Sequence, residues 1–174
     1  SLMQSKMTGN IVFVLLPPLS HGEFFAAYLL AAVARGLVVG CGVFAAAVWF
    51  VDLPLAHPLW ALLFALFGSG IMGALGIIAG IYSDKVEQLA VFQNFIILPL
   101  TFLSGVFYSI QSLPPLWQWL SHLNPIFYMV DGFRYGFFGH ADVQPLVSLA
   151  IVALCFFALS FLTFWLIKAG YKLR

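Results

Sequence analysis

The sequence predicts an all-α membrane protein: a polytopic bundle of about four transmembrane helices, with a hairpin of short helices at the outer face. Of its 174 residues, 63% are hydrophobic and only 7% are charged. Soluble domains carry about 25% charged residues, so this chain has too few to cover a surface that faces water. Its charges are also separated by long uncharged stretches, and each stretch fits the roughly 20 apolar residues that a membrane-spanning helix needs.

Three of these stretches predict three plain crossings. Their boundaries are charged residues, which belong in the loops, and Arg35 is the one charge that falls inside a stretch. We place the three spans near 24–50, 59–82 and 146–167, all within one transmembrane domain at 24–174. Lengths of this order are sufficient to cross the hydrocarbon core of a bilayer.

The longest uncharged stretch is too long for a single crossing and divides in two. Residues 88–108 are continuously apolar and predict another span, which Pro99 should kink because proline removes a backbone donor. Residues 109–144 are polar and aromatic instead. Within them, Asn124 followed by Pro125 is a good N-cap and first-turn pair. We therefore expect 109–144 to be a hairpin of short helices that does not cross.

Charge predicts the orientation of the bundle. Four crossings place both chain ends on one side, and the opposite loops carry only Arg134 as a basic residue. Trp117 and Trp119 give the outer hairpin the character of an interfacial aromatic belt. By the positive-inside rule, both ends are cytoplasmic. The basic residues on that side are Lys6, Lys85, Lys168, Lys172 and Arg174.

Residues 1–23 precede the first span. Their apolar run at 11–16 is too short to cross, and Pro17 with Pro18 ends any helix there. We interpret this segment as cytoplasmic and packed against either the membrane surface or another protein. The sequence starts without an initiator Met and without the apolar core of a signal peptide, so we expect a fragment whose upstream part is missing.

Several polar residues fall inside or beside the spans. Arg35 lies about 11 residues, or roughly 17 Å, into its helix, and ionisable groups at such depth are functional candidates. The alternative is a helix that starts below the membrane, with Arg35 paired to lipid phosphate or a helix end. Gln93 and Asn94 are adjacent amides, which in membranes more often bond between helices than contact a ligand. Asp131 and Arg134, three residues apart, predict a local ion pair.

Other patterns exclude some functions and leave others open. The four histidines are scattered in or beside loops, which argues against a metal site, and no basic stripe suggests nucleic acid. The sequence has no Gly-x-x-x-x-Gly-Lys-Ser/Thr loop, so any ATP hydrolysis would need a separate subunit. Glycines at packing spacing predict either close helix approach or dimerisation. These pairs are Gly36 and Gly40, Gly76 and Gly80, and Gly132 and Gly136.

The most specific stretch is 93–139, which reads Gln-Asn-Phe-Ile-Ile-Leu-Pro-Leu-Thr-Phe-Leu-Ser-Gly-Val-Phe-Tyr-Ser, then Leu-Pro-Pro-Leu-Trp, then Asn-Pro-Ile-Phe-Tyr-Met-Val-Asp-Gly-Phe-Arg-Tyr-Gly. With these motifs, nearly the whole chain resembles the permease subunit of type-2 ATP-binding-cassette exporters, in the bacterial branch of lipo-oligosaccharide and presumed drug exporters. That family carries a kinked span, an outer hairpin and a final span in this order. It has six spans with cytoplasmic ends, so this chain would hold the third to the sixth.

The resemblance implies a permease of the bacterial inner membrane that works as a homodimer among membrane lipid. It would export an amphiphilic drug, lipid or lipid-linked saccharide. ATP and Mg²⁺ are expected on a separate ATPase subunit, with no cofactor, metal or catalytic residue in this chain. The family's ATPase-docking segment falls on 6–23, where the contact candidates are Asn10, Phe13, Val14, Leu15, Leu16, Pro17, Pro18 and Glu23. Transport-path candidates are Arg35, Gln93, Asn94 and Pro99, and outer-gate candidates are Trp117, Trp119, Asn124, Pro125, Asp131 and Arg134.

Two other classes of function stay open. A non-enzymatic assembly or channel protein would use the outer hairpin as its working part, and a neighbouring gene for a P-loop ATPase would argue against it. An intramembrane serine hydrolase is less favoured. It would use Ser69 or Ser104 as nucleophile, and its base would have to be His122 or His140, because no histidine lies inside a span.

Overall fold

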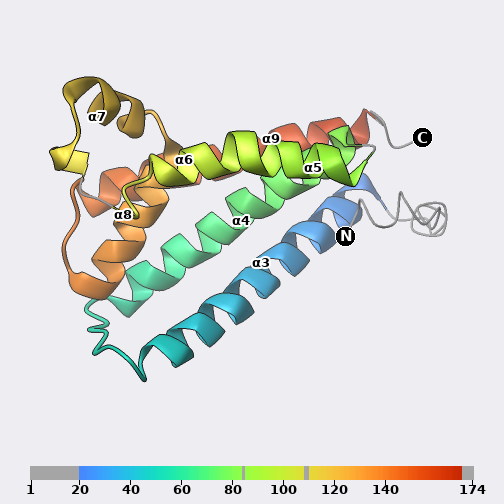
Figure 1. Ribbon diagram of the computed structural model, residues 1–174. Helices are drawn as coiled ribbons and strands as arrows, with labels where there is room; N and C mark the ends of the chain where they lie inside the picture. The colour runs from blue at the N-terminus through green and yellow to red at the C-terminus, as the bar shows by residue number, and fades with distance from the viewer. Residues whose placement is uncertain (1–19, 84, 108–109, 170–174) are drawn as a thin grey trace.

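A computed structural model describes residues 20–83, 85–107 and 110–169, and every regular element within them is a helix (Figure 1). This confirms the predicted all-α helical bundle. The elements are α3 (His21–Ala47), α4 (Pro58–Tyr82), α5 (Val86–Phe92), the π-helix η1 (Gln93–Ile97), α6 (Leu98–Phe102), the 3₁₀ helix η2 (Ile110–Ser112), α7 (Pro115–His122), α8 (Pro125–Phe138) and α9 (Pro145–Lys168).

Three of these helices are long and apolar enough to cross a membrane. They are α3, α4 and α9, with 27, 25 and 24 residues. At 1.5 Å per residue they extend about 36 to 40 Å, which exceeds the roughly 30 Å of a hydrocarbon core. Their ends lie within three residues of the predicted spans. Proline at the first position, where a missing N–H costs nothing, starts α4, α7, α8 and α9.

The predicted crossing at 88–108 is a shorter apolar helix, Val86–Phe102. It consists of α5, η1 and α6 in succession, and its 17 residues extend only about 25 Å. It ends earlier than predicted because the chain turns after Phe102 and Gly105 adopts a left-handed φ of 76°. The outer helices α7 and α8, with 8 and 14 residues, are too short to cross.

Pro99 does not end the helix that contains it. The five residues before Leu98 form the π-helix, in which the backbone N–H of Leu98 bonds to the carbonyl of Gln93. Pro99 has no N–H to donate to the preceding turn, which interrupts the usual helix bonding pattern there. The π-helix, which is wider than an α-helix, lies in that turn. The disturbance predicted at Pro99 therefore takes the form of a π-helical stretch, and the helix continues through it to Phe102.

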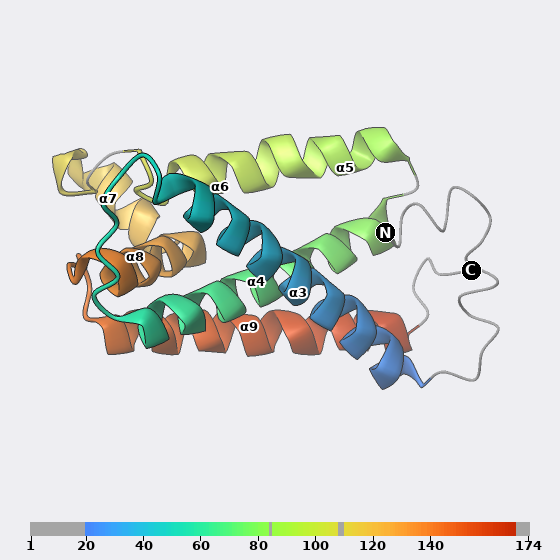
Figure 2. The same cartoon turned by 90° about the horizontal axis from the view of Figure 1, so that it is seen from below.

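Helix α4 is the centre of the bundle. It packs against α3, α8 and α9, and α3 crosses it at an angle (Figure 2). Two buried apolar clusters hold these helices together. One joins the start of α3 to the ends of α4 and α9, through Phe24, Ile77, Ile81, Leu166 and Ile167. The other joins α4, α8 and α9 in the outer half, through Phe64, Ile71, Ile126, Met129 and Val152.

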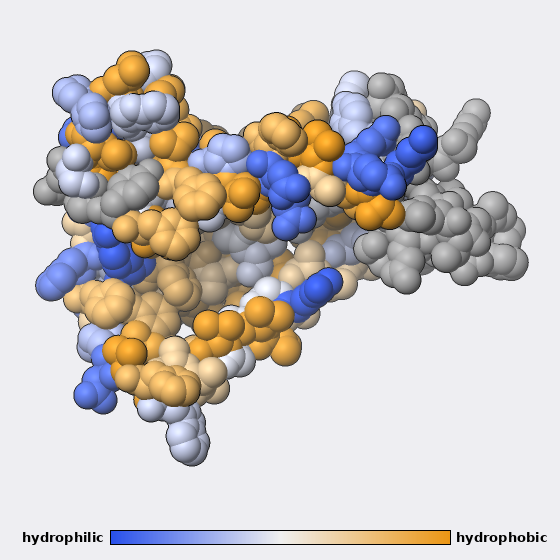
Figure 3. Space-filling view, in the orientation of Figure 1, coloured by the Kyte–Doolittle hydropathy of each residue, from blue (hydrophilic) through white to orange (hydrophobic). Residues whose placement is uncertain are grey.

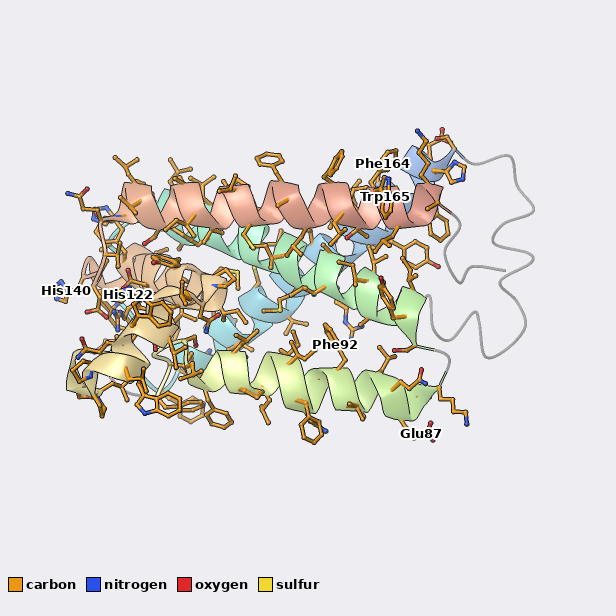
Figure 4. All side chains as sticks on the ribbon, turned by 90° about the horizontal axis from the view of Figure 1, so that it is seen from above. Glu87, Phe92, His122, His140, Phe164 and Trp165 are labelled. Atoms are coloured by element: carbon orange, nitrogen blue, oxygen red, sulfur yellow. The ribbon has the colours of Figure 1, made fainter. Side chains whose placement is uncertain are left out.

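The Val86–Phe102 helix is the most loosely attached of the apolar helices. It touches α4 through α5 and α8 through α6. Between α4 and α5 lies a cavity of about 480 Å³, whose lining includes Tyr82, Ser83 and Phe92. Figure 4 shows Phe92 directed from this helix toward the rest of the bundle. A helix with so few contacts can shift relative to the bundle at low energetic cost.

Glycines allow the closest helix contacts. A Cβ on Gly136 would lie 2.6 Å from the backbone nitrogen of Ala61, and one on Gly132 would overlap the ring of Phe64. Gly36 similarly sits against the side chain of Ser69. The pair on α8 therefore serves close packing against α4 within this chain. At Gly40, by contrast, a Cβ would meet nothing within 4 Å.

The surface of the bundle is suited to lipid. Figure 3 shows apolar side chains spread over the helices, with hydrophilic groups gathered mainly toward the two ends of the molecule. Large apolar side chains are widely exposed, including Val38, Leu154 and Phe161, each at 72%. A soluble monomer rarely exposes apolar patches of this extent. The exposure agrees with a membrane location for the bundle.

Candidate functional site

Arg35 lies deep in α3 and is exposed. It follows His21 by 14 residues, which places it roughly 21 Å along the helix. Helix α3 is about 10 Å longer than a hydrocarbon core, so Arg35 would remain roughly 11 Å inside even if all the excess lay on the cytoplasmic side. Among the residues that the structure describes, its guanidinium has no hydrogen bond or ion pair. This position favours a functional role over snorkelling from a helix end.

Gln93 and Asn94 open the π-helix and are both exposed. Neither side chain makes a hydrogen bond within the described part of the chain. The interhelical bonds that amides usually form in membranes are therefore not made inside this chain. Pro99, five residues further on, is also exposed. Since α3 packs on α4 and α9 while the Val86–Phe102 helix touches α4 and α8, the structure places the path candidates on separate helices.

Asp131 and Arg134 form the predicted ion pair, and the structure extends it into a network. The Asp131 side chain is fully buried, and its Oδ1 accepts a hydrogen bond from Arg134 Nη2 at 2.8 Å. Arg134 Nη2 also donates to Asp142 Oδ2 at 2.6 Å. The backbone N–H groups of Asp142 and Val143 donate to the Asp131 carboxylate at 2.8 and 3.1 Å. This carboxylate thus ties α8 to the turn that begins α9.

The network keeps Arg134 charged. Burial lowers the pKa of Arg134, but hydrogen bonds and charges from Asp142 and then Asp131 outweigh burial and raise it overall. Asp142 was not among the residues selected from the sequence. No local pattern indicates its role, because it lies eight residues from Arg134 and meets it only through the turn between α8 and α9.

Asn124 joins the outer hairpin to the short apolar helix. Its Oδ1 accepts from the N–H of Ile126 at 3.0 Å, which confirms the predicted N-cap of α8, with Pro125 in the first turn. Its Nδ2 donates to the carbonyl of Leu100 at 2.6 Å. In a regular helix the Leu100 carbonyl would accept from the N–H of Ser104. Here the Ser104 N–H donates to the carbonyl of Thr101 instead, so the Leu100 carbonyl is available to Asn124. One buried side chain therefore satisfies backbone groups of two helices.

Exposed aromatic side chains surround the outer end. Trp117 and Trp119 on α7 are 46% and 61% exposed. The chain that follows α3 lies at the same end as α7 (Figure 1). Trp49 and Phe50, just after α3, are 88% and 87% exposed, and sequence reasoning missed both. The signal was present, since the aromatic pair directly precedes Asp52 at the edge of a span. Tryptophan at this level is typical of a membrane interface.

The candidate ATPase contacts are only partly described. Asn10, Phe13, Val14, Leu15, Leu16, Pro17 and Pro18 lie outside the described residues. Glu23 lies in the first turn of α3, where it forms a capping box with Ser20. Its carboxylate accepts from the Ser20 N–H at 2.8 Å, while its own N–H donates to Ser20 Oγ at 3.2 Å. The capping box sets the start of α3 three residues earlier than predicted.

Neither serine proposed as a nucleophile has a base beside it. The Ser104 hydroxyl donates to the carbonyl of Thr101, and Ser69 packs against Gly36. Figure 4 places His122 and His140 at the outer end of the bundle. Within the described ranges, no group of three or more His, Cys, Asp or Glu residues could hold a metal ion. The described residues offer polar side chains on apolar helices and at their outer end, and they contain no serine paired with a histidine base.

Comparison with known proteins shows the family to which this chain belongs. Residues 1–138, which end with α8, match the family described as ABC-2 type transporter. The chain belongs to the ABC-2 type transporter family. It is 38% identical over 175 aligned positions to the inner membrane transport permease YadH of Escherichia coli strain K12, covering all of this chain and 68% of that protein. The protein is therefore a permease of a membrane transporter and a multi-pass inner membrane protein.

More distant relatives carry another name. The permease is 29% identical over 161 positions to nodulation protein J of Sinorhizobium fredii, covering 90% of this chain and 58% of the relative. It is 27% identical over 116 positions to nodulation protein J of Neorhizobium galegae, covering 64% and 44%. No solved structure matches the chain. The family implies association with an ATP-binding-cassette ATPase.

Proposed function

We propose that this permease is the membrane-spanning subunit of an ATP-driven exporter. It moves an amphiphilic substrate, a drug, a lipid or a lipid-linked saccharide, out of the cytoplasm. A separate ATPase subunit binds ATP and Mg²⁺ and supplies the energy. The observation that carries the proposal is the set of exposed polar side chains on apolar helices: Arg35, Gln93 and Asn94. An arginine at the centre of a span costs about 2.5–3.5 kcal/mol to insert, which favours a polar path over lipid as its surroundings.

A second copy of the permease completes this path. Support comes from α3, whose most apolar stretch has none of its residues buried in the single chain. Arg35 lies on this helix, beside Gly36, which packs against Ser69 of α4. Two copies that bring such surfaces together would enclose the polar groups between them and remove them from lipid. We expect a homodimer with two ATPase subunits on its cytoplasmic side.

Coupling to the ATPase runs through residues 6–23. The capping box at Ser20 and Glu23 supports this route, because it joins that segment directly to the first turn of α3. A displacement of the segment would pass along a continuous helix to Arg35. The cytoplasmic orientation of this end is supported by Lys85 and Lys168, at the ends of α5 and α9 away from Arg134.

The proposal is tested by expressing the full-length permease with the ATPase encoded next to it. We expect the two to purify together and the permease to stimulate ATP hydrolysis. Aspartate substitutions of Val14 and Leu16 should weaken both effects, because an acidic group would be forced into an apolar contact. Inside-out vesicles should then accumulate substrate from a panel of lipids, glycolipids and drugs only when ATP is present. ATPase binding that is indifferent to both substitutions contradicts the docking segment, and vesicles without ATP-dependent uptake contradict export.

A further inference from the structure

An apolar groove lies at the outer end of the bundle, between the second half of α3 and the outer face of α8. It encloses about 450 Å³, within the roughly 300–1,000 Å³ range of small-molecule sites. The groove opens because α3 leaves α4 after the contact between Gly36 and Ser69. Phe44 and Phe137, with ring centroids 5.6 Å apart, bridge the two helices there. Other lining residues are Gly40, Val43, Val130 and Phe133.

A second cavity adjoins the groove, and charged side chains form part of its lining. It has a volume of about 490 Å³, and its lining includes Arg134, His140 and Asp142. Arg134 and Phe138 line both cavities, so the charged groups stand at the end of the apolar groove. An apolar cavity that continues into a charged one fits an amphiphile, with its chain in the first and its headgroup in the second.

Arg134 and Asp142, which form the charged rim of the groove, have donors and acceptors that are not used within the described residues. Both carboxylate bonds of Arg134 use Nη2, so Nη1 and Nε have no partner among the described residues. Asp142 accepts from Arg134 through Oδ2, and its Oδ1 has no hydrogen-bond partner in the described part of the chain. The side chains are 34% and 23% exposed, so both can be reached from outside. A planar guanidinium with free donors suits a phosphate, and a free carboxylate oxygen suits an ammonium group.

The balance of charge selects the headgroup. Asp131, Arg134 and Asp142 together carry one negative charge, which disfavours a lipid whose headgroup is only anionic. A headgroup that is only cationic would be repelled by the Arg134 guanidinium. A zwitterion satisfies both, and an ammonium with N–H donors can bond to Asp142 where a quaternary amine cannot. Exposed Trp49 and Phe50 at this end place the rim near the level of lipid headgroups.

We propose that the groove between α3 and α8 binds one phospholipid with a phosphoethanolamine headgroup. One acyl chain lies along Gly40, Val43 and Phe133. The phosphate accepts from Nη1 and Nε of Arg134, and the ammonium donates to Oδ1 of Asp142. The bound lipid fills the space between α3 and α8 and bridges them. This site does not depend on export, because it requires only the membrane location of the bundle.

Two glycine variants of α3 form a matched test. A Cβ on Gly40 or on Gly42 would meet nothing within 4 Å, so leucine fits at both positions. Only Gly40 lines the groove. The full-length protein is purified from nanodiscs holding equal parts of phosphatidylethanolamine, phosphatidylglycerol and phosphatidylcholine, and retained lipid is counted by native mass spectrometry. We expect one phosphatidylethanolamine per protomer. Gly40→Leu should reduce its affinity about tenfold, as displacing two buried methylene groups would, while Gly42→Leu leaves it unchanged.

The headgroup is tested by Asp142→Asn, which keeps the backbone bond to Asp131. This variant should lose the preference for phosphatidylethanolamine over phosphatidylcholine while still retaining a lipid. The proposal is overturned if the unmodified protein holds no lipid at one per protomer, or holds the three headgroups equally. It is also overturned if both leucine variants release lipid alike, or if Gly40→Leu changes the number of protomers, which would make the groove the seat of a second copy. Export assays do not enter these outcomes, so failure here leaves the proposed function unaffected.

Discussion

Asn124 and Leu100, 24 positions apart in the chain, are joined by a 2.6 Å hydrogen bond from the side-chain amide to the backbone carbonyl. Through it the outer hairpin holds the end of the Val86–Phe102 helix, which otherwise has few contacts with the bundle. Asn124 is 3% exposed, so the bond is shielded from water. A movement of the hairpin would therefore displace α6 first. Helix α6 directly follows the π-helix that carries Gln93 and Asn94.

Asn124→Asp should separate the two roles of this side chain. The carboxylate can still accept from the N–H of Ile126 and cap α8, but it cannot donate to the Leu100 carbonyl. One of its oxygens would instead face that carbonyl oxygen, and both atoms are hydrogen-bond acceptors. We expect a loss of about 1–3 kcal/mol in stability, the usual effect of an unsatisfied buried group. Thermal unfolding of the purified protein measures the loss, and amide exchange should increase in α6 more than in α8. An unchanged melting temperature would show that the bond to Leu100 contributes little.

Asp131 and Asp142 should respond differently to the same change. Asp131→Asn should cost about 1–3 kcal/mol, because the buried carboxylate accepts three hydrogen bonds and an amide group can replace only part of them. Asp142→Asn should cost less than about 1 kcal/mol, since its pair with Arg134 is partly exposed. Both are measured by thermal unfolding under identical conditions. Equal losses would argue that Asp131 has no special part in joining α8 to α9.

Gly136→Ala should destabilise the contact between α8 and α4. The added methyl would lie within 2.7 Å of the backbone of Ala61, and the backbone cannot move aside as a side-chain tip can. Overpacking of this kind costs about 1–3 kcal/mol. Gly76→Ala is the control, because its Cβ meets nothing within 4 Å and alanine improves helix propensity by up to about 1 kcal/mol. Thermal stability should fall for the first variant and stay equal or rise for the second.

Arg35→Leu should abolish export without reducing the amount of permease in the membrane. Removing the charge favours insertion by about 2.5–3.5 kcal/mol, so any lost transport cannot be attributed to failed insertion. Arg35→Lys keeps the charge and should retain part of the activity. Membrane content is measured by immunoblot of washed membranes, and transport by ATP-dependent uptake into inside-out vesicles. Normal uptake by the leucine variant would exclude Arg35 from the path.

Local composition was sufficient to predict the helices but not all their limits. Apolar stretches between charges located α3, α4 and α9, because a bilayer imposes the same length on every span. The end of the Val86–Phe102 helix was placed too far along, since residues 103–108 are apolar as well. The chain turns there at Gly105, and apolarity alone does not distinguish a helix from a turn.

For the candidate site, contacts between residues close together in the chain could be predicted from the sequence, whereas contacts between separate helices followed from their packing. The ion pair of Asp131 with Arg134 and the N-cap at Asn124 act over a few residues, so spacing was enough to predict them. The bonds from Asn124 to Leu100 and from Arg134 to Asp142, and the groove between α3 and α8, depend on where separate helices end relative to one another. Their packing sets those positions, through contacts such as Gly136 with Ala61, and no local pattern records them.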